Sequence, residues 1–184
     1  MTIYTDCMVD VETTGLESGR NAMIQIAAVK FNLETQEVSP EFFNRCLRIP
    51  PHRFWDEDTW NWWSNDKAAI LISILKRAED PALVMKDFVD WSTKEDTNVP
   101  TFWSKPSHFD FPFVASYCRD YGLVMPYDFR RANDMRSFMR GKAWPLPAIE
   151  PRIEFAGTAH NAIHDVLHQI QVLFEFVSCD HGQN

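Results

Sequence analysis

Two acidic residues, Asp10 and Glu12, alternate at the end of an apolar, β-prone segment that begins near Cys7. The turn-forming sequence Thr13-Thr14-Gly15 follows, so the pair is predicted to lie at the C-terminal end of a strand. Side chains of a strand alternate between its faces, which places both carboxylates on one face. Like charges this close repel and are costly to desolvate. The pair therefore indicates either a metal site or a wet strand end.

A third carboxylate, Asp110, follows an aromatic-rich strand candidate over Thr101–Ser104. It opens a predicted helix over Phe111–Tyr121, with Pro112 acceptable in the first turn. On this pattern alone, Asp110 is either a site residue or an acidic residue at a helix N-terminus.

A histidine and a fourth carboxylate lie near the C-terminus. Asp165 belongs to the first turns of a predicted amphipathic helix over Ala162–Val177. His160 lies on the loop before that helix, and Asn161 is its predicted N-cap. Ala162 shares the helix face of Asp165, and its small side chain permits a strand or a metal to approach closely.

In this order along the chain, the four carboxylates and the histidine resemble the DEDD superfamily of 3'-5' exonucleases, in its histidine subclass. His160 precedes Asp165 by five residues, as in that subclass, and Asn161 occupies the place of the tyrosine of the other subclass. Three segments resemble the small RNase-T-like exoribonucleases and the exonuclease A type of tailed phages: Phe109–Pro112, Asn133–Arg136 and Gly157–Ala162.

The resemblance implies a ribonuclease H-like fold, an α/β mixed sheet flanked by helices, as a single exonuclease domain over residues 1–184. Sequence patterns predict strands first and helices later, which agrees with such a sheet. The predicted strands are Asp6–Glu12, Met23–Phe31, Phe42–Ile49 and Thr101–Ser104, and the earlier helices are Asp56–Trp63, Lys67–Arg77 and Ala82–Trp91. The segment between the predicted helices Phe111–Tyr121 and Ala162–Val177 is expected to be broken by Gly141, Pro145, Pro147 and Pro151.

The implied reaction is hydrolysis of phosphodiester bonds at 3' ends of single-stranded DNA or RNA, with release of nucleoside 5'-monophosphates. The resemblance implies that Asp10 bridges two ions and that Glu12 and Asp165 complete the coordination of the ion that holds the nucleophile. It implies that Asp110 acts on the second ion. Oxygen ligands suit Mg²⁺ or Mn²⁺. His160 takes the proton of the attacking water, because an imidazole with a pKa near 6.5 suits a base at neutral pH.

Substrate-binding candidates follow Glu12. Backbone groups of Thr13, Thr14, Gly15 and Leu16 are suited to bind a terminal 3'-hydroxyl, and by resemblance Leu16 wedges between the last two bases. The alternative for Leu16 is a loop residue packed on the core. Further candidates are Trp63 and Phe109. Aromatic side chains stack on bases, but the tryptophans at 55, 60, 62 and 63 also suit a core or a dimer interface.

The net charge of −8 argues against sequence-independent binding along a duplex, which depends on many cationic contacts to phosphates. A metal site escapes this objection because divalent cations reverse the local field. The densest basic cluster consists of Arg130, Arg131, Arg136, Arg140 and Lys142. It is either a backbone-contact region or a solvated face paired with Asp128 and Asp134.

Four scattered cysteines without zinc spacing favour reduced thiols in a cytoplasmic protein, or in the host cytoplasm if a phage encodes it. No apolar run is long enough to span a bilayer, so no membrane partner is expected. The expected partner is a single-stranded 3' end, and the resemblance allows a homodimer. Two alternatives are a non-catalytic end-binding module on the same fold and a phosphohydrolase of free nucleotides.

Overall fold

The computed structural model describes residues 3–94, 99–143, 150 and 152–180. Its strands form one five-stranded mixed sheet in the order β3-β2-β1-β4-β5. They are β1 (Asp6–Thr13), β2 (Met23–Asn32), β3 (Glu37–Cys46), β4 (Thr101–Ser104) and β5 (Asn133–Asp134). The first three strands pair antiparallel in a meander, whereas β4 pairs parallel with β1 and β5 parallel with β4. The predicted meander and mixed sheet are confirmed.

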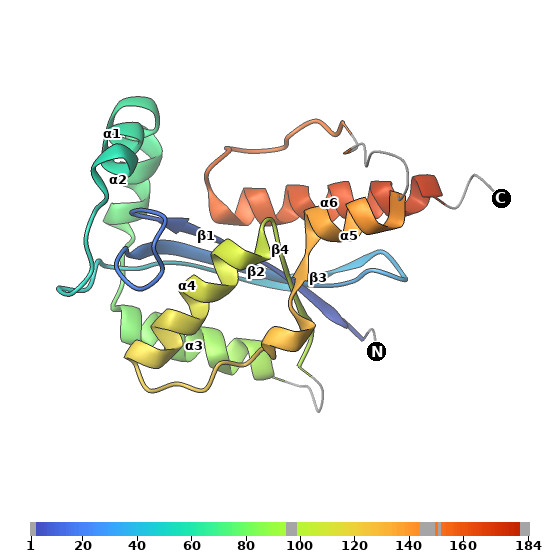
Figure 1. The fold of residues 1–184 in the computed structure, drawn as a ribbon, viewed down its shortest axis with the longest axis horizontal. Helices are drawn as coiled ribbons and strands as arrows, with labels where there is room; N and C mark the ends of the chain where they lie inside the picture. The colour runs from blue at the N-terminus through green and yellow to red at the C-terminus, as the bar shows by residue number, and fades with distance from the viewer. Residues whose placement is uncertain (1–2, 95–98, 144–149, 151, 181–184) are drawn as a thin grey trace.

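Helices cover both faces of the sheet (Figure 1). They are α1 (Glu57–Asp66), α2 (Ala68–Lys76), α3 (Pro81–Thr93), α4 (Ser107–Asp120), α5 (Met135–Ala143) and α6 (Ala162–Asp180), with a 3₁₀ turn, η1 (Phe129–Arg131). In Figure 1, α5 and α6 lie on one face, α3 and α4 lie on the other, and α1 and α2 lie beyond one end. Within the described ranges, no helix is both long and apolar enough to cross a membrane.

The alternation of β1 decides which residues meet which layer. Cys7, Val9 and Val11 are buried in the core shared with α3 and α4. Met8 is buried in the second core, which includes Val166, Ile170 and Leu173 of α6. Since side chains two residues apart share a face, Asp10 and Glu12 continue the face of Met8 toward α6. The predicted division of this strand is confirmed.

The third strand begins five residues before its predicted start and ends three before its predicted end. It contains Pro40, which lacks a backbone N–H and is tolerated because β3 is an edge strand of the sheet. The register with β2 shifts between Val29 and Phe31, opposite this part of β3. Tertiary pairing therefore extends the strand through residues with low strand propensity.

Two predictions are corrected, one for the helix that carries Asp110 and one for the segment after it. Helix α4 begins at Ser107, so Asp110 lies in its first turn and Pro112 lies inside the helix. The segment expected to be broken contains β5 and α5. The reason is Asp134, whose Oδ1 accepts a hydrogen bond from Ser137 N (2.7 Å) and whose Oδ2 accepts one from Ser107 N (2.9 Å). One carboxylate thus caps both helices. The expected breaks at Pro145, Pro147 and Pro151 lie outside the described residues.

Candidate active site

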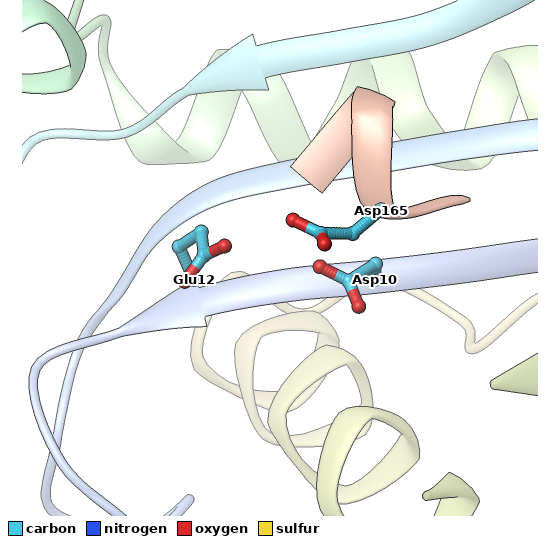
Figure 2. A group of neighbouring side chains, drawn as sticks. All are labelled: Asp10, Glu12 and Asp165. Atoms are coloured by element: carbon cyan, nitrogen blue, oxygen red, sulfur yellow. The ribbon is translucent and has the colours of Figure 1, made fainter. Parts of the chain in front are cut away.

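Three carboxylates from two elements meet at the C-terminal end of β1. Asp10 and Glu12 project from the strand toward Asp165, which projects from the first turn of α6 (Figure 2). One oxygen atom of each carboxylate lies within 4.8 Å of those of the other two, and all three residues are half-buried. Helix α6 is held there by its apolar face, which packs on the sheet. The three predicted ligands are therefore brought together.

The arrangement fits a hard divalent cation. Asp165 Oδ2 is buried and has no hydrogen-bond partner within the described structure, and neither has the buried Gln169 Oε1 on the next turn of α6. An unpaired buried carboxylate oxygen is costly unless a cation neutralises it. Oxygen ligands at this density are those that Mg²⁺ and Mn²⁺ prefer.

Electrostatic repulsion is strong among these groups without a cation. Burial, followed by the charges of Asp110, Glu12 and Asp165, raises the pKa of Asp10 well above its ordinary value. Burial and the charges of Asp165 and Asp110 raise the pKa of Glu12 to about 8. Burial also raises the pKa of Asp165. Since all three shifts disfavour the charged form, the cluster attracts either protons or cations.

The fourth predicted ligand, Asp110, lies beside the cluster rather than within it. It is buried, and its Oδ1 accepts a hydrogen bond from Val11 N (3.1 Å). The pairing of β1 with β4 runs only from Asp6 to Met8. Beyond the end of β4, Asp110 therefore provides the hydrogen-bond acceptor for the backbone N–H of Val11 on β1. Burial raises the pKa of Asp110 to about 7, although the bond from Val11 opposes this shift.

His160 stands at the turn before α6 in a left-handed conformation, with φ of 62°. Its ring contacts the Trp62 ring edge to face, with 4.8 Å between the ring centroids. Burial lowers the pKa of His160 below 6.5, although the charge of Asp165 opposes the shift. The lowered pKa favours the neutral imidazole, which is the form that accepts a proton.

The turn after Glu12 is held by hydrogen bonds from several directions. Thr14 Oγ1 donates to Phe54 O (2.8 Å) and accepts from Ala22 N (2.7 Å). The buried Arg53, which sequence reasoning did not single out, donates to Ser18 O and Asn21 O, each at 2.7 Å.

Gly15 is required at its position in this turn. A Cβ there would lie 2.4 Å from the Asn21 side chain, closer than real atoms approach. Asn21 Oδ1 itself accepts from Glu17 N (2.9 Å), so the asparagine is fixed in place. The turn therefore presents one rigid conformation beside the carboxylates.

The structure separates the substrate-binding candidates. Leu16 is 78% exposed, so the alternative of core packing is wrong for this residue. Trp63 is 1% exposed and cannot stack on a base; its Nε1 instead donates to Thr13 O (3.1 Å) and supports the turn. Phe109 is half-buried, and its ring packs on that of Phe113.

Two glutamines of the site were missed by sequence reasoning. Gln169 Nε2 donates to Asp10 Oδ1 (2.9 Å), and Gln25 Nε2 donates to Asn161 Oδ1 (3.0 Å). Gln169 lies four residues after Asp165, which is the spacing of neighbours on one helix face and the signal that could have identified it. Asn161 was predicted as a side-chain N-cap, but its Oδ1 accepts from Gln25.

Several other polar residues have structural roles. His164 Nδ1 accepts from Thr158 N (2.9 Å), so this histidine supports the loop before α6. Within the basic cluster, Arg130 lies 3.6 Å from a carboxylate oxygen of Asp128, as the solvated-face alternative expects. Arg131 donates to Thr101 Oγ1 (3.1 Å).

Solved structures share this fold at low sequence identity. The nuclease domain of 3'hExo, a DEDDh family member bound to rAMP, has a TM-score of 0.69 and 16% identity, over 96% of this chain and 93% of that chain. The E. coli ExoI–ssDNA complex has a TM-score of 0.75 and 15% identity, over 99% of this chain and 42% of that chain. S. pombe Pop2p in its Mg²⁺- and Mn²⁺-bound form has a TM-score of 0.65 and 13% identity, over 95% of this chain and 83% of that chain. These likenesses confirm the predicted ribonuclease H-like fold.

No curated protein sequence matches this chain significantly. The family described as the 3'-5' exoribonuclease Rv2179c-like domain matches residues 5–177, nearly the whole chain. The match confirms the predicted 3'-5' exonuclease and favours it over a non-catalytic end-binding module. The chain therefore belongs to the Rv2179c-like 3'-5' exoribonuclease domain family and is a hydrolytic 3'-5' exonuclease.

Proposed function

We propose that this exonuclease removes the last nucleotide from the 3' end of single-stranded DNA or RNA at the carboxylate cluster, with two Mg²⁺ or Mn²⁺ ions. The observation that carries the proposal is the group of Asp10, Glu12 and Asp165, whose ligand oxygens lie within 4.8 Å of one another. The unpartnered Asp165 Oδ2 supports the need for a cation. Bound nucleic acid and bound Mg²⁺ and Mn²⁺ in the named structural neighbours support the same substrate and cofactor.

Each carboxylate has a proposed role. Asp10 would contribute to both ion sites, Glu12 and Asp165 would complete the first, and Asp110 would act on the second through water. When bound, the ions stabilise charge on the attacked phosphate and on the leaving 3'-oxygen. The protein holds its ligands on a strand and a helix packed together, so the ligand oxygens are pre-organised.

His160 is the proposed general base. Its neutral imidazole accepts a proton from the attacking water and then releases it to solvent. The half-buried position of His160, beside the Trp62 ring and near enough to Asp165 for that charge to act on the imidazole, supports this assignment. Asp165 stabilises the protonated ring, because its charge raises the pKa of His160.

The turn from Thr13 to Leu16 is the proposed binding site for the terminal nucleotide. Leu16 projects to solvent from a rigid turn, which suits insertion between the last two bases. The side chains of Thr13 and Thr14 are buried and support the turn from below, so contacts to substrate come from the backbone of Gly15 and Leu16.

The proposal also covers the setting of the enzyme. A single domain over residues 1–184 acts in the cytoplasm, or in a host cytoplasm if phage-encoded, and assembles as a homodimer. Reduced thiols support this location, since Cys7, Cys46 and Cys118 are free and buried.

Matched single-stranded DNA and RNA oligonucleotides, each with a free or blocked 3' or 5' end, test the proposal. We expect stepwise release of nucleoside 5'-monophosphates from free 3' ends with Mg²⁺ or Mn²⁺, and no release in excess EDTA. A duplex of the same sequence is the matched control. Cleavage that starts at the 5' end, or that continues at full rate in EDTA, would contradict it.

A further inference from the structure

A buried glutamine on the central sheet faces the candidate active site. Gln25 is fully buried on β2 and pairs directly with Glu12 of β1 in the antiparallel register. Residues opposite each other in such a pair share a face of the sheet. Gln25 therefore lies on the α6 face, beside the carboxylate cluster.

The amide of Gln25 connects the sheet to the turn before α6. Its Nε2 donates to Asn44 Oδ1 of β3 (2.9 Å) and to Asn161 Oδ1 (3.0 Å), while its Oε1 accepts from Ala162 N (3.4 Å). Both amide protons are thus engaged, and one of the free N–H groups at the start of α6 has its acceptor on the sheet. A buried amide with every bond made has one orientation.

The turn that Gln25 holds contains the proposed base. His160 precedes Asn161 directly and adopts a left-handed backbone, which is strained for a residue with a Cβ unless its surroundings impose it. Asn161 O accepts the first helical bonds, from His164 N (2.8 Å) and Asp165 N (3.1 Å). A fixed Asn161 therefore orients the adjacent His160, whereas Asp165 is held in place by the packing of α6 on the sheet.

We propose that Gln25 is a positioning residue of the reaction, which holds His160 in place through Asn161. The inference rests on the proposed base role of His160. The hydrogen bonds of the Gln25 side chain go to Asn44, Asn161 and Ala162 and to none of the proposed metal ligands, so we expect its effect on rate to pass through the histidine.

Single-turnover rates at saturating substrate and Mn²⁺ test this inference. Gln25→Met keeps the side-chain volume and removes the amide, and we expect a rate about 10- to 100-fold lower, as for other small displacements of a reacting group. The KM and the Mn²⁺ affinity should stay within about threefold, because the carboxylates and the end-binding turn are untouched. Gln171→Met, at an exposed position on α6, is the matched control and should retain the full rate.

A double-mutant cycle shows whether the effect passes through His160. In the His160→Ala background, Gln25→Met should lower the rate less than threefold further, on the order of the error of such cycles. Asn161→Ala should reproduce the loss of Gln25→Met, and it provides the test if Gln25→Met does not fold.

Two outcomes would overturn the inference: an equal loss from Gln25→Met in both backgrounds, or a full rate in Gln25→Met and Asn161→Ala. A full rate in His160→Ala alone would instead overturn the base assignment of the proposed function.

Discussion

Gln169 Nε2 donates a 2.9 Å hydrogen bond to Asp10 Oδ1 and so joins helix α6 to strand β1 within the candidate metal site. The two elements carry different ligands, Asp165 on the helix and Asp10 on the strand. The bond stabilises the charged form of Asp10, because a hydrogen bond to a carboxylate lowers its pKa. A neutral amide achieves this without adding charge to a crowded site, and it fixes which oxygen of Asp10 faces the cluster.

Removal of this amide should weaken metal binding. We expect Gln169→Ala to reduce the apparent affinity for Mn²⁺ by about 10- to 100-fold, as is typical when the hydrogen-bonding partner of a metal ligand is lost. Titration of the melting temperature with Mn²⁺ measures the effect independently of activity. Gln171→Ala, two residues along the same helix and exposed, is the control. Equal Mn²⁺ titrations for both variants would exclude the role of Gln169.

Neutralisation of a ligand should separate activity from stability. Asp10→Asn and Asp165→Asn are each expected to abolish turnover, because a cation ligand is lost. In metal-free buffer the same variants should melt a few degrees higher than the wild type, since each removes one member of a set of repelling carboxylates. Thermal unfolding in EDTA, with and without added Mg²⁺, measures the gain. If a variant cleaves at the normal rate, the residue that it replaces is not a metal ligand.

The stability of the metal-free protein should fall as pH rises. The pKa of Glu12 is about 8 against an ordinary 4.5, and that of Asp110 is about 7 against 3.8. Between these limits the folded state binds more protons than the unfolded state, so the free energy of unfolding decreases with pH. The stabilisation is complete below about pH 4 and lost above about pH 8.

Melting temperatures in EDTA across pH 4 to about 9 measure this dependence. Saturating Mg²⁺ should flatten the upper part of the curve, because the cation replaces the protons. Asp165→Asn should also flatten it, since the charge of Asp165 contributes to the raised pKa of Glu12. A melting temperature that increases from pH 5 to pH 8 in EDTA would contradict the shifts.

The fold was predictable where a segment carries its own periodicity. The alternation of β1 and the helical spacing of α6 assign Asp10 and Asp165 each to a face of its own element, and the family resemblance implied that the two residues meet. Strand β5 has only two residues and no periodic signal, and α5 depends on the cap that Asp134 provides. Strand β5 exists because it pairs with β4, which a local pattern does not contain, whereas the cap of α5 lies only three residues before Ser137 and is a local signal that sequence reasoning missed.

The site was predictable where residue type reports chemistry. Closely spaced carboxylates and a histidine suggest metal and proton chemistry by themselves. Gln25 and Gln169 are neutral amides, whose importance follows only from the buried partners that the fold brings to them. Trp63 has the residue type of a base-stacking platform, but it is buried, and burial is decided by the packing of α1 and α2.

Leu16 should affect substrate binding and not stability. Leu16→Ala removes an exposed side chain, so the melting temperature should stay within about 1 °C, as expected for a surface substitution. Loss of the wedge should raise KM for single-stranded oligonucleotides about 3- to 10-fold. Stacking of an aromatic side chain on a base is worth roughly 1 to 3 kcal/mol, and contact of a leucine side chain with a base contributes only part of that energy. Leu83→Ala, at an exposed position on α3, is the control. An unchanged KM would remove Leu16 from the binding site.

His160 is the sharpest test of the mechanism. A base acts in its unprotonated form, so the rate should rise with pH and level off above the pKa of His160, which burial lowers below 6.5. His160→Ala should reduce the single-turnover rate by roughly 10² to 10⁴ and remove this limb of the pH profile, while Mn²⁺ and substrate binding persist. His164→Ala should reduce the rate much less, because the bond from Thr158 to His164 supports the loop without touching the reacting atoms. Equal rates for wild type and His160→Ala would eliminate the base assignment, and a larger loss at His164 would transfer the role to that residue.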